Sequence, residues 1–197
     1  MQETVRAFRW LLAVGLGLAS PLAGAAVIYT TALSGAAESP PNASPGTGFA
    51  EVTIDALAHT MRVEVSFSSL TGNTTASHIH CCTAVAGVGN IGVATQLPTF
   101  AGFPLGVTSG SYDHLFDLTD LASWNAAFVA AHGGTAAGAE AALLAGLDDG
   151  RAYLNVHTTA FPGGEIRGFL QVPEPATLAL LGVAFAGLGL SRRRRLN

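Results

Sequence analysis

The chain has 197 residues, nine basic and thirteen acidic side chains, and a formal net charge of −4. This value understates how acidic the middle of the chain is, because six of the nine arginines lie near the two ends and there is no lysine. The middle, residues 26–171, keeps three arginines against eleven carboxylates, a net charge of −8. Such a segment has the length of one ordinary domain and repels polyanions, so nucleic acid is excluded as a partner.

The first 25 residues have the three parts of a secretory signal peptide. Arg6 and Arg9 supply a basic start, residues 10–18 form a short apolar run, and residues 23–25, Ala-Gly-Ala, supply a cleavage site. An uncleaved N-terminal anchor is the alternative, but the apolar run is short for a membrane span. We therefore predict that residues 1–25 are removed by signal peptidase.

The next segment predicts short antiparallel strands. Residues 48–57 and 61–67 alternate between apolar and polar side chains, and the short link between them predicts a hairpin with one buried face. Similar patterns predict further strands at residues 29–33, 77–80, 87–96 and 110–118.

Two histidines and two cysteines follow one another at the end of the strand predicted at 77–80. Side chains alternate along a strand, so His78 and His80 share a face and can ligate one metal ion. Cys81 and Cys82 are adjacent, so they do not join distant segments, and no disulfide framework is expected. This cysteine pair can form a vicinal disulfide, pair with another chain or bind a metal, and export favours its oxidation.

Within the middle of the chain, helical signals appear only before the last strands. Residues 123–131, with Ser123 as the cap, and residues 135–147, with Thr135 as the cap, predict two helices. Strands are predicted again at 152–158 and 165–172. Many short strands without alternating helices predict an all-β fold, an antiparallel β-sandwich or barrel-like domain with a short helical insertion before the last hairpin.

A third histidine lies in the strand predicted at 152–158. His157 shares a face with Tyr153 and Asn155, and it completes a three-histidine site for copper or zinc if this strand lies beside the earlier pair. Asn155 and Glu165 are then expected to support the ligands from outside. The alternative is a polar seam in which the histidines hydrogen-bond to one another, to Asn155 and to the backbone. Glu165 and Arg167, two residues apart, are expected to form an ion pair.

Four short motifs in this order resemble the CHRD domain. They are Leu-Ser-Gly-Ala-Ala-Glu-Ser-Pro-Pro at 33–41, His-Ile-His at 78–80, Asn-Val-His-Thr at 155–158 and Pro-Gly-Gly-Glu-Ile-Arg-Gly at 162–168. The resemblance spans residues 29–170 and implies an all-β, sandwich or barrel-like module. Many members have glycine after His-Ile-His, where this chain has Cys81 and Cys82.

The C-terminal tail combines a proline motif, an apolar run and a basic end. The run, residues 176–190, carries no charge and as a helix just reaches across a membrane. A block of arginines after such a helix stops it with the basic end in the cytoplasm. The motif and the stop consist of Pro173, Glu174 and Pro175, and of Arg192, Arg193, Arg194 and Arg195.

This order resembles the PEP-CTERM sorting signal of bacterial surface proteins, over residues 172–195. The resemblance implies that the tail holds the protein transiently in the inner membrane of a Gram-negative bacterium. There exosortase, a membrane protease, is expected to recognise and process it. The alternative is an ordinary C-terminal anchor. We therefore divide the chain into a signal peptide (1–25), a CHRD domain (26–171) and a sorting segment with a transmembrane helix (172–197).

The resulting functional prediction is an exported surface or extracellular-matrix protein. Its CHRD domain is expected to be a non-catalytic binding or structural module that contacts extracellular polysaccharide or a surface protein, with no cofactor. The alternative is an exported copper- or zinc-binding protein, and possible redox enzyme, that uses His78, His80 and His157. A third hypothesis is a passive domain whose only functional element is the sorting tail.

Overall fold

The computed structural model describes residues 26–173, which form strands, a helical insertion and two closing strands. The insertion contains α1 (Ala126–Ala131) and α2 (Ala136–Asp148), and it precedes the last hairpin as predicted. Two short 3-10 helices are η1 (Gly35–Ala37) and η2 (Leu121–Ser123). The strands are β1 (Val27–Ser34), β2 (Thr47–Asp55), β3 (Thr60–Ser68), β4 (Thr74–His80), β5 (Gly110–Asp117), β6 (Tyr153–Thr158) and β7 (Ile166–Phe169).

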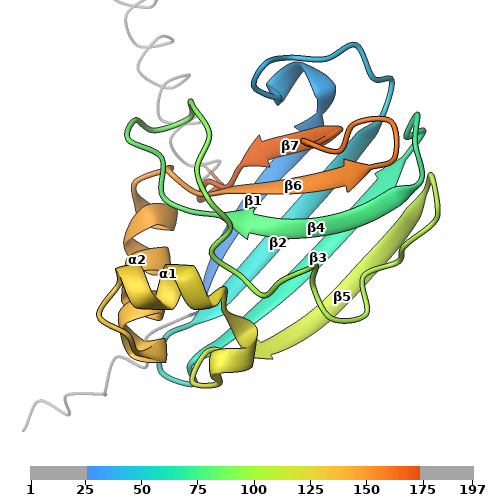
Figure 1. Cartoon of the computed structure of the whole chain (residues 1–197). Helices are drawn as coiled ribbons and strands as arrows, with labels where there is room; N and C mark the ends of the chain where they lie inside the picture. The colour runs from blue at the N-terminus through green and yellow to red at the C-terminus, as the bar shows by residue number, and fades with distance from the viewer. Residues whose placement is uncertain (1–25, 174–197) are drawn as a thin grey trace, which may run out of the picture.

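The strands of the described residues form one antiparallel sheet in the order β4-β6-β7-β1-β2-β3-β5. The sheet curls into a half-barrel, so that β4 and β6 lie across from β2 and β3 (Figure 1). The barrel-like prediction is confirmed. A sandwich of two separate sheets is wrong, because β7 pairs with β1 at Arg167 and Ser34 and so joins the two walls. Strand twist, accumulated over seven strands, accounts for the curl.

The core lies inside this curl. Alternate residues of β2 and β3 point inward. The sequence pattern predicted this for β3, whereas on β2 the apolar Phe49 is 47% exposed and Ala50 points inward instead. From the opposite wall, Ile79, Leu154 and Val156 are fully buried. The inward residues of β2 and β3 are Ala50, Val52, Ile54, Met61, Val63, Val65 and Phe67.

The long connection between β4 and β5, residues 81–109, covers the outer edge of β4. The strand predicted at 87–96 is wrong, because this stretch forms only isolated bridges, such as the one between Val93 and His80. The connection instead satisfies carbonyl groups that an edge strand leaves unpaired. Its amides donate to oxygens of β4: Ala94 to Ile79 (2.9 Å), Phe100 to Ser77 (3.1 Å) and Gly106 to Thr74 (2.9 Å).

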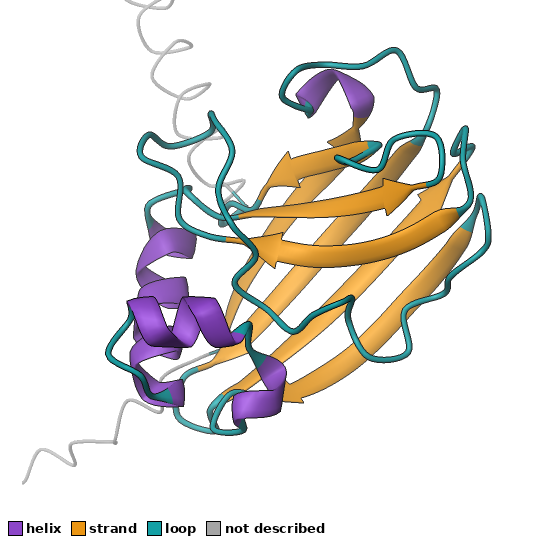
Figure 2. Cartoon of the chain, in the orientation of Figure 1, coloured by secondary structure: helices purple, strands orange, loops and turns teal. Residues whose placement is uncertain are grey.

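The two helices lie at one end of the half-barrel (Figure 2). Thr135 caps α2 as predicted, its hydroxyl accepting from the Gly138 amide at 3.1 Å. The cap of α1 is Asn125, whose side chain accepts from the Ala127 amide. Ser123 was predicted in that role, but it ends η2 and donates its hydroxyl proton to the Asp117 carbonyl instead.

A disulfide joins Cys81 to Cys82, so of the three states predicted for this pair the vicinal bridge is the one found. Helix α2 passes directly over it. A Cβ atom at Gly146 would overlap both sulfur atoms, so the absence of a side chain there permits the close approach.

The Gly146→Ala substitution is expected to destabilise the protein by about 1–3 kcal/mol, the usual cost of overpacking a core. We expect this loss to exceed the gain in helix propensity, because the added Cβ atom would overlap two sulfur atoms at once. Denaturant unfolding measures the change. Gly163→Ala is the matched control, since a Cβ atom at Gly163 meets open space; equal stability of the two variants would contradict the packing argument.

No helix within residues 26–173 is long and apolar enough to cross a membrane. The signal peptide predicted at 1–25 and the transmembrane helix predicted at 176–190 lie outside the described residues, as do Glu174, Pro175 and the four arginines. Pro173 is the last described residue and is exposed.

Candidate metal centre

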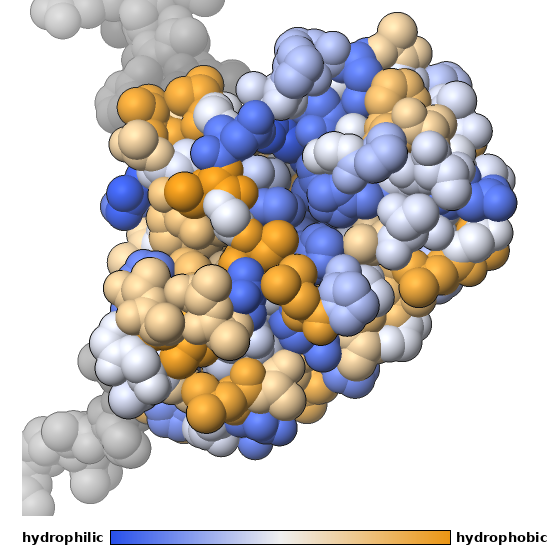
Figure 3. All heavy atoms as spheres, viewed as in Figure 1, coloured by the Kyte–Doolittle hydropathy of each residue, from blue (hydrophilic) through white to orange (hydrophobic). Residues whose placement is uncertain are grey.

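Three histidines of β4 and β6 lie on one face of the sheet. The two strands are neighbours, with His78 opposite Asn155, His80 opposite Tyr153 and Ala76 opposite His157. This face is turned away from the core. Hydrophilic residues gather along the middle of the molecule in this view, where β4 and β6 run (Figure 3). The predicted juxtaposition of the two histidine motifs is therefore present.

The three imidazoles converge on one point. One ring nitrogen from each of His78, His80 and His157 lies within 4.8 Å of the others. His78 Nδ1, His80 Nε2 and His157 Nε2 are buried without a hydrogen-bond partner. They are the nitrogens free to converge, because the other nitrogen of each ring bonds to a carbonyl. Buried polar atoms without partners are rare, so three that face one another need an explanation.

Each imidazole is fixed through its other nitrogen. His78 Nε2 lies 2.6 Å from the Pro98 carbonyl, His80 Nδ1 2.8 Å from that of Ile91, and His157 Nδ1 2.9 Å from that of Pro162. A carbonyl only accepts, so these nitrogens carry the protons and the three converging nitrogens carry lone pairs. Metal-binding histidines show this arrangement, in which the outer N–H group donates to a carbonyl and sets the tautomer.

Burial keeps these rings neutral. Desolvation lowers the pKa of His80 to about 4, although its hydrogen bond to Ile91 opposes the shift. Burial also lowers the pKa of His78 and of His157, against their hydrogen bonds to carbonyl groups. Neutral imidazole is the form that binds a metal ion, so near neutral pH the three lone pairs are available.

The alternative of a hydrogen-bonded seam is present only in part, since each ring does bond to a backbone carbonyl. Within residues 26–173, no hydrogen bond of the structure joins two of these histidines or joins one of them to Asn155. The rings instead meet edge to face or tilted, with centroids 5.3 to 6.1 Å apart. The converging nitrogens are therefore not part of a closed polar network.

Comparison with known proteins agrees with the motifs. The family model of the CHRD domain matches residues 29–170, most of the chain. The chain belongs to the CHRD family. The model of the PEP-CTERM protein-sorting motif matches residues 171–195. No match was found among curated proteins or among solved structures.

The sorting motif defines the route of this CHRD protein in general terms. It indicates export and targeting to the cell surface of a Gram-negative bacterium, and it implies recognition by exosortase, a membrane protease.

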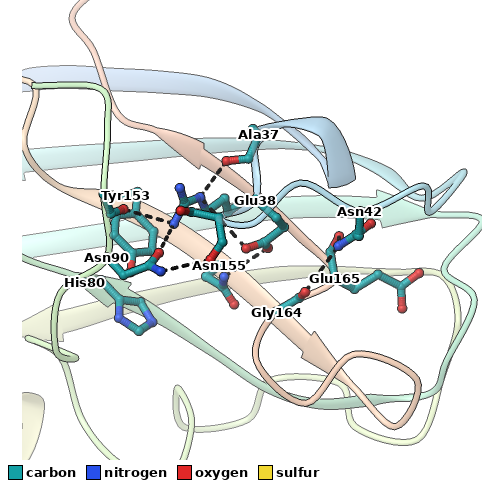
Figure 4. A network of polar contacts seen from close by, with 12 residues as sticks. Ala37, Glu38, Asn42, His80, Asn90, Tyr153, Asn155, Gly164 and Glu165 are labelled. Atoms are coloured by element: carbon teal, nitrogen blue, oxygen red, sulfur yellow. Dashed lines mark hydrogen bonds and ion pairs between the residues drawn. The ribbon is translucent and has the colours of Figure 1, made fainter.

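The motifs of this CHRD domain meet around the histidines. Asn155 Nδ2 donates to Glu38 Oε1 at 3.0 Å, and Arg167 Nε lies 3.8 Å from the other oxygen of Glu38. Figure 4 shows Asn155 next to Glu38, with Tyr153 on one side and Gly164 on the other. A Cβ atom at Gly164 would overlap the Asn155 amide and crowd Glu38, and the φ of +133° there also favours glycine.

The predicted ion pair between Glu165 and Arg167 is wrong. Arg167 is almost fully buried and faces Glu38, and its guanidinium also donates to the Ala37 carbonyl and to Asn90 Oδ1, both at 2.6 Å. Burial raises the pKa of Glu38 to about 7, although the charge of Arg167 opposes the shift. The acidic partner of Arg167 is therefore Glu38 and not the predicted Glu165.

The buried Glu165 carboxylate belongs to a separate network. Its oxygens accept from Ser44 Oγ and Thr158 Oγ1, both at 2.5 Å, and from the Thr71 and Gly72 amides at 2.5 and 3.1 Å. Among the described residues, neither Glu165 nor any of these donors hydrogen-bonds to an imidazole, so Glu165 holds loops together instead of supporting the ligands. Asn155, the other residue predicted to support them, does lie directly opposite His78.

Sequence reasoning missed the groups that orient the rings. The three carbonyls come from Ile91, Pro98 and Pro162, all in irregular loops, where sequence patterns carry no signal. The Tyr153 ring stacks on the His80 ring with centroids 4.7 Å apart. The Arg167 guanidinium also lies over the Tyr153 ring, 4.7 Å from its centroid. The sequence analysis placed Tyr153 on the same face as the histidines, and the stacking contact could have been predicted from that placement.

Proposed function

We propose that this protein is an exported surface protein whose CHRD domain binds a transition-metal ion through His78, His80 and His157. One observation carries the proposal: three buried imidazole nitrogens converge without partners, while the opposite nitrogen of each ring is tied to a carbonyl. A bound ion would satisfy all three nitrogens at once. Metal binding, the alternative in the sequence analysis, is thereby favoured over a purely structural module.

The donor set favours zinc or copper. Imidazole nitrogen suits zinc, copper, nickel and iron, whereas calcium and magnesium prefer oxygen ligands. The three-histidine cluster contains no carboxylate. The disulfide removes the thiolates of Cys81 and Cys82 from the possible ligands, which leaves an all-imidazole set.

The proposed role is one of binding at the cell surface. We infer that the sorting segment holds the protein transiently in the inner membrane until exosortase processes it, and that the domain is then displayed or released into extracellular polymer. That this CHRD module is not an enzyme, and that it contacts polysaccharide or a surface protein, remain predictions.

Metal titration tests the proposal directly. The exported protein, purified without a histidine tag and stripped with a chelator, should bind one zinc or copper ion per chain, measured by elemental analysis after gel filtration. Saturating metal should also raise the unfolding temperature, because an ion that binds only the folded chain stabilises it by mass action. Binding of well under one ion per chain, with no thermal shift, would count against a metal site.

A further inference from the structure

A fourth unpartnered atom lies on the same face as the three histidine nitrogens. Asn155 Oδ1 is buried and makes no hydrogen bond, and Asn155 is only 3% exposed. Within residues 26–173, the buried side-chain atoms without a partner number five, and four of them are this oxygen and the three nitrogens. A metal ion accounts for the nitrogens but leaves this oxygen unexplained.

The position of Asn155 places it beside the ligands. It is directly opposite His78 in the antiparallel pair and two residues before His157 on β6, so all three side chains share one face. Directly opposite residues have Cβ atoms about 4.5–5.5 Å apart, and same-face neighbours two residues apart along a strand are also adjacent. The amide is therefore next to the point at which the imidazoles converge.

The orientation of the amide is set by its other end. Asn155 Nδ2 donates to Glu38 Oε1. In its ionised form, which the charge of Arg167 favours, Glu38 accepts from an N–H group and has no proton to donate to an amide oxygen. The carboxyl of Glu38 is in turn held by the buried guanidinium of Arg167, with a shortest distance of 3.8 Å. This chain of contacts keeps Nδ2 toward Glu38 and leaves Oδ1 as a fixed acceptor.

We propose that the metal ion bound at His78, His80 and His157 keeps an exchangeable fourth position, occupied at rest by a water molecule that donates a hydrogen bond to Asn155 Oδ1. This inference rests on the proposed metal site. Three protein ligands plus water is the pattern of zinc sites that keep an open position, whereas structural sites are closed by four protein ligands. An amide oxygen is a hard ligand that suits calcium or magnesium, so accepting a hydrogen bond is its better role beside imidazole-bound zinc or copper.

The arrangement selects the kind of ligand that the site takes. A ligand with a proton on or next to its metal-binding atom, such as water or a hydroxyl compound, satisfies Asn155 Oδ1. An anion without a proton displaces the water and leaves a buried acceptor unsatisfied, which is costly. Asn155 is in this sense a positioning and selectivity residue for small oxygen-donor ligands.

The copper(II)-loaded protein provides the test. In water enriched in ¹⁷O, the electron paramagnetic resonance lines of wild type should broaden through a directly bound oxygen, and azide should remove this broadening. The Asn155→Leu variant should still bind copper, with affinity reduced no more than about 10- to 100-fold, the range for loss of an outer contact. It should bind azide about five-fold more tightly than wild type, because the penalty of one unsatisfied acceptor is gone.

Asn73→Leu is the matched control. Asn73 lies in the exposed loop directly before β4, five residues before His78, and among the described residues its side chain makes no hydrogen bond, so its azide affinity should equal that of wild type. If Asn155→Leu does not fold, Asn155→Ala replaces it with the same expectation. Copper that binds without ¹⁷O broadening, or azide affinity that is unchanged at Asn155, would overturn the inference while leaving the metal site intact. Failure of wild type to bind copper or zinc at all would overturn the proposed function itself.

Discussion

Alanine in place of any one of His78, His80 and His157 is expected to weaken zinc binding by at least about 100-fold, the upper end of the loss seen when only an outer partner of a ligand is removed. Each ring supplies one of three converging lone pairs, so each variant leaves a two-ligand site. Isothermal titration against a competing chelator measures the change. The thermal stabilisation by zinc should disappear in the same three variants.

His114→Ala is the control for these variants. His114 lies on β5 and is partly exposed, and among residues 26–173 it belongs to no cluster of metal-binding side chains. Its zinc affinity should match that of wild type. Equal weakening at His114, or full binding after loss of His80, would place the zinc elsewhere, for example on the acidic surface, and would reject the three-histidine centre.

The histidine cluster shows how far sequence reasoning reaches. Alternation along a strand correctly put His78 with His80, and His157 with Asn155, because side-chain direction in a regular strand is a local property. The sequence analysis assumed that β4 lies beside β6 and did not derive it. This pairing joins strands more than seventy residues apart in the sequence, and no local pattern encodes it. The four motifs indicated the pairing only through their resemblance to the CHRD domain.

Reasoning failed where the backbone leaves the strand. The expected contact between Glu165 and Arg167 assumed that both residues lie in one extended segment. β7 begins at Ile166, and Glu165 sits in a bend after Gly164, so the alternation rule does not apply to it. Its carboxylate turns toward Ser44 and Thr71 instead of toward the guanidinium.

The same limit explains the single sheet. Each strand showed a pattern compatible with a sandwich or with a barrel, since both bury one face. The choice is made where β7 crosses to pair with β1, through the Ser34–Arg167 register and the neighbouring bridge between Thr30 and Gln171. Such pairing between chain ends has no local signature in either strand.

The Glu165→Ala substitution is expected to destabilise the protein by about 3–5 kcal/mol. The fully buried carboxylate accepts from two hydroxyls and two backbone amides, and alanine leaves these donors without a partner, at about 1–3 kcal/mol for each one that water does not reach. Glu165→Gln keeps the shape and one acceptor oxygen and should lose less. Urea unfolding monitored by circular dichroism measures both, and Glu51→Ala, on the outer face of β2, serves as the control.

Acid should reproduce part of this loss in wild type. Burial alone would raise the pKa of Glu165, but the hydrogen bonds from Ser44, Thr158, Thr71 and Gly72 outweigh it and lower the pKa below its ordinary value of 4.5. A carboxyl whose pKa is lower in the folded than in the unfolded chain contributes stability above 4.5, and this contribution is lost as the pH falls through the folded-state pKa. The difference in unfolding free energy between wild type and Glu165→Gln should therefore shrink on acidification from pH 6 to pH 3, because only wild type loses a stabilising charge over this range. A difference that stays constant over this range would mean that the carboxylate charge contributes nothing to holding the two loops together.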